Sequence, residues 1–222
     1  MNTALRTGIA FLAILILSNA HAEDDPGGEL PSTSPNGRFV IRQIDDKEQV
    51  KFGKDNDSSL AIFDTKTRKL VSIVPSEIGI AFPESLYVIW SKDSTRLALN
   101  FRAGGRYCIT SLLRLDGGKF IELPSPVETL EALAAKTKLE AVKSMGLNPD
   151  TYQRRIYDTF VTRRWLDGNT IEADARSVSS VLIKEKDGEN SEDVIASFRC
   201  IVKWNSKTKT WTILKTKKLK EN

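Results

Sequence analysis

The chain has 222 residues, of which 40% are hydrophobic and 28% are charged, and its formal net charge is +4. This hydrophobic content is enough to form a folded core and excludes a mainly disordered protein. The only histidine, His21, lies within the first 22 residues, so a protein that loses this segment has no histidine. For such a mature protein, the sequence excludes a histidine general base, histidine-dependent nucleophiles and the common histidine zinc sites.

Residues 1–22 have the pattern of a secretory signal peptide. Arg6 precedes the apolar stretch 9–17, and Ala20-His21-Ala22 is a small-x-small cleavage site. The apolar stretch is much shorter than the roughly 20 residues that a membrane-spanning helix needs. We therefore expect cleavage after Ala22, a periplasmic or secreted bacterial protein, and no stable membrane insertion.

The remainder divides into a lead segment and one β-rich domain. Residues 23–36 are acidic and rich in Pro, Gly and Ser, which predicts a flexible linker before a single domain at 37–222. Runs of β-forming residues between turn residues predict a blade-like part at 37–124 and further strands at 150–217. The expected strands are 38–44, 59–64, 69–74, 86–90, 96–101, 106–115, 119–123, 159–165, 170–175, 178–184, 194–204 and 210–215.

One amphipathic helix is expected at 125–146, between these two groups of strands. Ser125 is a suitable N-cap, Pro126 suits the first helical position, and Glu128 completes an S-x-x-E capping box. Gly146 can end the helix. The apolar residues that share one face are Val127, Leu130, Leu133, Ala134, Ala141 and Met145. We expect this face to pack on the protein's own sheet, with a partner-binding helix as the alternative.

A short pattern recurs along the chain. Residues 34–41 (SPNGRFVI) are echoed at 90–99 (WSKDSTRLAL) and again at 165–171, each as a polar turn that leads into a strand. The pattern resembles WD40-like (TolB-type) β-propeller repeats, although Lys92 and Ser94 stand where that family has Pro and Gly. The resemblance implies a mainly β fold of two or three blade-like antiparallel meanders, as an incomplete propeller or an irregular sandwich. It transfers no catalytic or binding residue to this chain.

The two cysteines, Cys108 and Cys200, lie in predicted strands. In an oxidising compartment they form either a disulfide, which would close a loop of about ninety residues, or two buried free thiols. The sequence leaves both alternatives open. Their spacing excludes C-x-x-C redox chemistry and c-type haem attachment.

Several motifs that carry chemistry elsewhere are incomplete here. The acidic loops at 55–59 and 187–193 hold oxygen ligands, but in the first loop Leu60 and Lys66 replace the Gly and Glu that an EF-hand needs. Ser206 and Lys209 match S-x-x-K, yet the motif falls in a predicted exposed turn. We therefore predict no catalytic, cofactor-binding or metal-binding residue from motifs.

Charge is unevenly distributed along the chain. Residues 203–222 hold seven lysines and one acidic residue, which allows adhesion to anionic envelope polymers or lipid headgroups but also suits a solvated edge strand. Glu172 and Asp174 share one face of a strand and are expected to face solvent. The sequence favours a non-enzymatic binding or scaffold module for an envelope protein or polymer, with no nucleic-acid partner. The alternative is a hydrolase of an extracellular polymer that uses Asp/Glu pairs.

Overall fold

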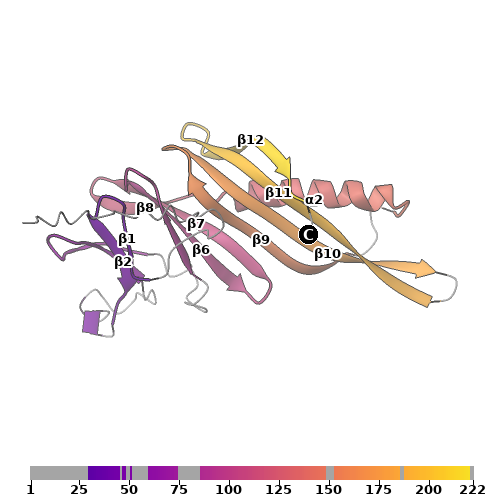
Figure 1. Cartoon of the computed structure of the whole chain (residues 1–222), viewed down its shortest axis with the longest axis horizontal. Helices are drawn as coiled ribbons and strands as arrows, with labels where there is room; N and C mark the ends of the chain where they lie inside the picture. The colour runs from indigo at the N-terminus through magenta and orange to yellow at the C-terminus, as the bar shows by residue number, and fades with distance from the viewer. Residues whose placement is uncertain are drawn as a thin grey trace, which may run out of the picture.

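A computed structural model describes residues 30–45, 47–48, 51, 60–74, 86–148, 153–185 and 188–220. The predicted signal peptide and the acidic loop at 55–59 lie outside these ranges. The fold is mainly β, with two sheets that close into neither a barrel nor a propeller, and with the helix α2 (Val127–Ser144) beside the larger sheet (Figure 1).

The smaller sheet is an antiparallel meander of four strands in chain order. It contains β1 (Ser32–Thr33), β2 (Phe39–Gln43), β3 (Leu60–Asp64) and β4 (Leu70–Ile73). Strand β1 falls inside the segment that we expected to be a flexible linker. The two residues of β1 are ordered because they pair with Ile41 and Val40 of β2.

The larger sheet consists of two more antiparallel meanders. The first contains β5 (Tyr87–Trp90), β6 (Arg96–Gly104), β7 (Tyr107–Asp116) and β8 (Lys119–Leu123). The second contains β9 (Gln153–Trp165), β10 (Thr170–Glu185), β11 (Gly188–Asn205) and β12 (Thr210–Lys218). The two meanders join where β7 and β9 pair in parallel for two residues. This junction makes one continuous sheet with the order β12-β11-β10-β9-β7-β6-β5.

Strand β10 is continuous where two strands, 170–175 and 178–184, were expected. The polar residues Arg176 and Ser177 suggested a break, but both pair with β9 and β11 in regular register. The Arg176 side chain is exposed, and Ser177 is buried opposite Asp158 of β9. Polar residues are therefore accommodated on both faces of this strand.

Helix α2 confirms the predicted helix, but its N-terminal cap differs from the prediction. It starts at Val127 with Pro126 as the N-cap and without the predicted capping box, although the Ser125 hydroxyl accepts a hydrogen bond from the Val127 N–H at 3.3 Å. At the other end Gly146 has left-handed backbone geometry, with φ of 73°, and its N–H donates to the Lys143 carbonyl at 3.0 Å. A glycine in this conformation is the usual helix terminator.

The apolar face of α2 also differs at one position. Met145 is 38% exposed, so its predicted burial is wrong. Val142 is buried instead and packs against Val181 and Val194 of the long β10–β11 hairpin. The difference arises because Met145 is the C-cap residue, beyond the last turn that lies on the sheet.

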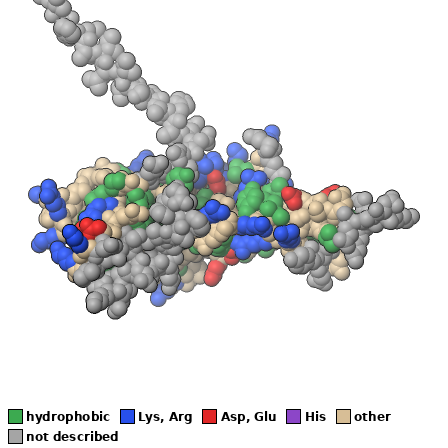
Figure 2. Space-filling view, turned by 90° about the horizontal axis from the view of Figure 1, so that it is seen from below, with side chains coloured by type: hydrophobic (Ala, Val, Ile, Leu, Met, Phe, Trp, Pro, Cys, Tyr) green, Lys and Arg blue, Asp and Glu red, His purple; other side chains and the backbone are tan. Residues whose placement is uncertain are grey.

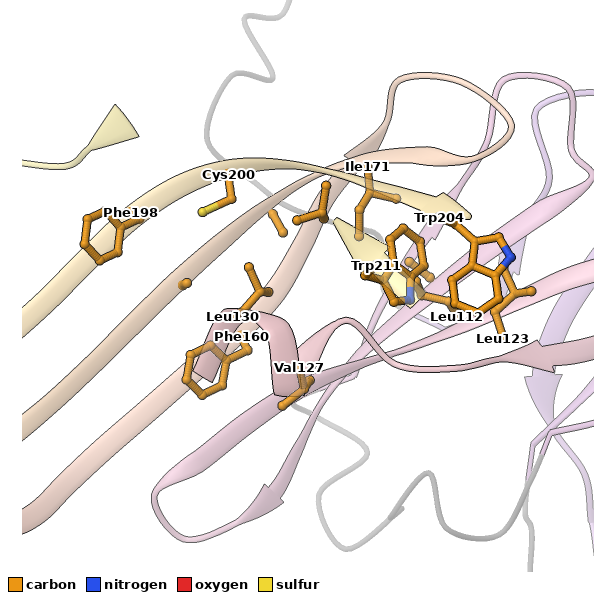
Figure 3. Close-up of a cluster of buried hydrophobic side chains, with 14 of the residues drawn as sticks. Leu112, Leu123, Val127, Leu130, Phe160, Ile171, Phe198, Cys200, Trp204 and Trp211 are labelled. Carbon is orange, nitrogen blue, oxygen red and sulfur yellow. The ribbon is translucent and has the colours of Figure 1, made fainter. Parts of the chain in front are cut away.

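Two hydrophobic cores lie on opposite faces of the β5–β8 meander. One core lies between β5–β8 and the smaller sheet and includes Phe39, Ile62, Leu97, Leu99 and Phe120. The other lies between β5–β8, β9–β12 and α2, where the side chains labelled in Figure 3 point toward one another. Because both of its faces are covered, the β5–β8 meander forms the centre of the molecule.

The first two repeated turns have the same hydrogen-bonded structure. In the first, the Ser34 hydroxyl donates to Asn36 Oδ1 at 2.9 Å and accepts the Phe39 N–H at 2.9 Å. In the second, the Ser91 hydroxyl donates to Asp93 Oδ1 at 2.6 Å and accepts the Arg96 N–H at 2.9 Å. A residue with positive φ follows the Asn or Asp in each turn: Gly37 in the first and Ser94 in the second.

The two cysteines lie too far apart to form a disulfide within the chain. Cys108 is in β7 and Cys200 is in β11, with β9 and β10 between them, and both thiols are free. Three strand spacings of about 4.8 Å separate the strands by about 14 Å. A disulfide requires Cα atoms within about 7 Å. The disulfide alternative is therefore excluded by this fold, and Cys200 points into the core (Figure 3).

Candidate binding face

The strands β9–β11 have one face covered by α2 and one face that the helix leaves open (Figure 1). Phe198, Cys200 and Val202 of β11 point toward the helix, as the alternation in the sequence predicted. Because side chains alternate along a strand, Arg199 and Lys203 lie on the opposite face. We call this helix-free surface of β9–β12 the open face.

Basic side chains predominate on the open face. The register between strands shows which residues share it, because residues directly opposite in antiparallel strands lie on the same side. Lys217 and Lys215 of β12 pair with Arg199 and Ile201 of β11. The basic members of the face are Arg163, Arg164, Arg176, Arg199, Lys203, Lys215 and Lys217, and the acidic members are Glu172 and Asp174.

The two acidic residues are engaged in ion pairs with arginines. Asp174 contacts Arg199 Nε at 2.9 Å and Arg163 Nη1 at 3.1 Å. Glu172 contacts Arg164 Nε at 2.9 Å. The prediction that Glu172 and Asp174 share one strand face is confirmed. Each carboxylate orients guanidinium groups, which differs from the apolar surroundings that a general acid needs.

A groove of about 480 Å³ crosses the open face. Tyr157 and Arg176 form one part of its lining, with the guanidinium carbon 5.3 Å from the ring centroid. The chain after β12 forms another part, because the Leu219 N–H donates to the Ser197 carbonyl at 2.9 Å and brings Lys220 to the groove. The groove therefore combines an aromatic ring with the positive charges of Arg176 and Lys220, and its one carboxylate, Asp174, is paired with Arg163 and Arg199.

The positive charge extends beyond the groove. A second hollow of about 420 Å³ is lined by Lys203, Lys207, Thr212 and Leu214 near the β11–β12 turn. Figure 2, which shows the molecule from below, has Lys and Arg side chains near its middle and a separate group of them at its left end, where Figure 1 places β1, β2 and β8. A surface of this charge attracts anions.

A polar cluster that the sequence did not predict lies beside α2. The Tyr107 hydroxyl donates to Glu131 Oε1 at 2.7 Å, and the Arg155 guanidinium lies 4.5 Å from the Tyr107 ring centroid. Arg155 also forms an ion pair with Asp158, which is 8% exposed and is the one buried carboxylate among the described residues. Burial, followed by the hydrogen bond to Glu131, raises the pKa of Tyr107. No sequence signal identified this cluster, because its members come from β7, α2 and β9.

Lys138 and Ser179 meet in the same interface. Lys138 Nζ donates to Ser179 Oγ at 2.9 Å, and burial lowers the pKa of Lys138. A serine beside a lysine can act as a nucleophile. However, Ser179 is only 2% exposed, so its hydroxyl is closed to a polymeric substrate. The predicted S-x-x-K motif lies elsewhere: Ser206 and Lys209 are exposed in the β11–β12 turn, as expected.

The described residues contain no group of three or more His, Cys, Asp or Glu side chains placed to hold a metal ion. Of the second acidic loop, residues 188–193 lie within the described ranges, and the side chains of residues 190–193 are exposed. Among the helices in the described ranges, none has the length and apolarity required to span a bilayer.

Comparisons with protein-family models, with curated proteins and with solved structures found no match to this chain.

Proposed function

We propose that this protein is an exported, non-enzymatic binding module whose open face takes an anionic polymer of the bacterial cell envelope. The observation that carries this proposal is the excess of basic over acidic side chains on the open face, together with the groove of about 480 Å³ that crosses it. A groove and an array of charges suit an extended ligand better than a single small anion.

The spacing of the basic side chains supports a ligand with repeated charges. Lys217 and Arg199 lie opposite each other on neighbouring strands, a separation of about 5 Å between Cβ atoms. Lys215 lies two residues before Lys217 on the same side of β12, about 7 Å away along the strand. Asp174 orients Arg199 and Arg163 within this array. Regularly placed cations on a stiff sheet complement a chain of phosphates or carboxylates.

We also propose that the three meanders are diverged copies of one blade-like repeat that do not complete a propeller. The equivalent hydrogen bonds of the first two turns support this origin, as does the Asn36 N–H, which donates to Ser94 Oγ at 3.1 Å and joins those turns. The third turn retains only part of the pattern: Asp167 Oδ1 accepts the Asn169 N–H at 2.7 Å. On this proposal the repeats act as a scaffold for the open face.

Charge reversal on the open face tests the binding proposal. We expect the mature protein to bind polyphosphate or polygalacturonate, with an affinity that falls as salt increases. The double variant Arg176→Glu, Lys217→Glu should weaken binding about 30-fold or more, because each basic side chain near an anionic surface contributes about 1 kcal/mol. Titration calorimetry at several salt concentrations measures this change, and the preferred polymer distinguishes phosphate from carboxylate ligands.

The matched control is Lys66→Glu, Lys119→Glu, which changes the net charge equally. Both lysines are exposed: Lys66 lies in the β3–β4 turn, and Lys119 is the first residue of β8. The control should bind almost as the unmodified protein does. Equal losses in the two double variants would show that net charge alone governs binding and would contradict the open face as the site. Shortening of the polymer during the titration would favour the hydrolase alternative.

A further inference from the structure

The side chains around the groove form three rows across the open face. Residues directly opposite in antiparallel strands share a row, so the strand register assigns each residue to one of them. The apolar row has Tyr157, Val178 and Ile195, the middle row has Thr159, Arg176 and Ser197, and the charged row has Val161, Asp174, Arg199 and Lys217. A ligand in the groove therefore meets apolar side chains on one side of Arg176 and charged side chains on the other.

Arg176 is the arginine of these rows that can pair with a ligand. Arg199 is engaged by Asp174 at 2.9 Å, whereas Arg176 is exposed and forms no ion pair with any described residue. The Arg176 guanidinium carbon lies over the Tyr157 ring, 5.3 Å from its centroid. A guanidinium carries its N–H groups in its own plane, so contact with a ring leaves a fork of parallel donors for an anion.

The apolar row distinguishes between the anions that match this fork. A carboxylate and a phosphate both accept two parallel hydrogen bonds from an arginine. Polyphosphate has charged oxygens along its whole length and gains nothing from contact with Tyr157 and Ile195, which are half-buried. A sugar ring has C–H groups for such a contact, and its hydroxyls suit Thr159 and Ser197, whose side chains both donate and accept hydrogen bonds.

We propose that the polymer on the open face is an acidic polysaccharide. A carboxylate of one sugar unit pairs with Arg176, and C–H groups of the same unit contact Tyr157. This inference rests on the proposed function and narrows it to one class of polymer. Single-stranded nucleic acid suits the groove less well, because successive bases stack on several aromatic rings. Among the described residues that line the groove, Tyr157 is the only aromatic one, and Arg176 lies over its ring.

Titration calorimetry on the mature protein tests this proposal with polygalacturonate, polyphosphate and oligothymidylate of equal charge number. We expect polygalacturonate to bind about tenfold tighter than the other two polymers, because it alone combines carboxylates with C–H groups for the apolar row.

Two substitutions test the groups that carry this preference. Arg176→Lys keeps the charge but removes the fork, and should lower the ratio of polygalacturonate affinity to polyphosphate affinity about fivefold. The side chain is exposed, so this change preserves the fold. Tyr157→Thr removes the ring and should lower the same ratio by a similar factor.

The matched control is Arg68→Lys, because Arg68 is exposed between β3 and β4, outside the open face. It should keep the affinity ratio of the unmodified protein. The inference is overturned, while the proposed function stands, if polyphosphate or oligothymidylate binds as tightly as polygalacturonate. It is also overturned if Arg176→Lys and Tyr157→Thr both keep the full ratio. If none of the three polymers binds, the proposed function falls with it.

Discussion

Three elements of the fold form the surroundings of the Tyr107 side chain. Strand β7 supplies the tyrosine, α2 supplies its acceptor Glu131, and β9 supplies Arg155 against the ring. The hydrogen bond and the burial both favour the neutral phenol in the folded state. Ionisation of Tyr107 at alkaline pH should therefore destabilise the folded protein.

We expect Tyr107→Phe to lower the free energy of unfolding by about 1 kcal/mol at neutral pH, because one hydrogen bond is lost. The pKa of Tyr107 is raised in the folded state, so its stabilisation is complete below the ordinary tyrosine pKa of about 10 and is lost as the pH rises above it. The variant should consequently lose less stability than the unmodified protein between neutral and strongly alkaline pH. Urea denaturation over this range measures the difference, and identical pH slopes would contradict the assignment.

At the scale of elements, a buried side chain joins the two meanders of the larger sheet. Strands β7 and β9 pair for only two residues before they diverge. Beyond that point, Asn100 of β6 donates from Nδ2 to the Thr162 carbonyl at 2.7 Å and accepts the Thr162 N–H at 3.0 Å. The Asn100 side-chain amide thus takes the place of a neighbouring strand, because it satisfies both the backbone N–H and the backbone carbonyl of Thr162.

Asn100→Ala should destabilise the protein by about 2–4 kcal/mol, because it leaves the buried N–H and carbonyl of Thr162 without partners. Chemical denaturation monitored by tryptophan fluorescence measures this loss. Asn205→Ala is the control: Asn205 accepts the Lys207 N–H at 3.0 Å in an exposed turn, so its loss should cost much less. Comparable effects of the two substitutions would show that Asn100 does not join the meanders.

For the whole molecule, the proposed export determines which residues the functional protein contains. Removal of residues 1–22 lowers the net charge from +4 to +3, because Arg6 is the only charged side chain in that segment, and it also removes His21. The mature chain then has no side chain whose ordinary pKa lies near neutrality. Its charge, and hence its attraction to anions, should vary little between about pH 6 and 8.

Intact-mass measurement of the protein recovered from the envelope of an expressing bacterium tests the export. The expected mass corresponds to a chain that begins at Glu23 with two free thiols. A chain that retains Met1–Ala22, or one recovered only from the cytoplasm, would contradict export and would restore His21 to the functional protein.

Local patterns predicted most of the elements. The strands from β2 to β8 and the helix α2 lie close to their expected positions, because alternation, turn residues and a terminating glycine act within a few residues of one another. Local patterns were less reliable for β10, where Arg176 and Ser177 resembled a break. Strand β10 tolerates both polar residues because Ser177 lies on the face covered by α2, opposite Asp158, and Arg176 is exposed on the open face.

The sequence alone determined that the chain is mainly β, that a helix follows the first strands, and that hydrophobic and basic residues alternate along β11. Only the tertiary structure decided that β7 pairs with β9, that Cys108 and Cys200 lie too far apart to bond, and that Asn100 satisfies the buried backbone of Thr162. The reason is physical: side-chain alternation and turn formation are governed by neighbouring residues. Which strand pairs with which, and which group satisfies a buried donor, depend instead on how hydrophobic faces from distant parts of the sequence pack together.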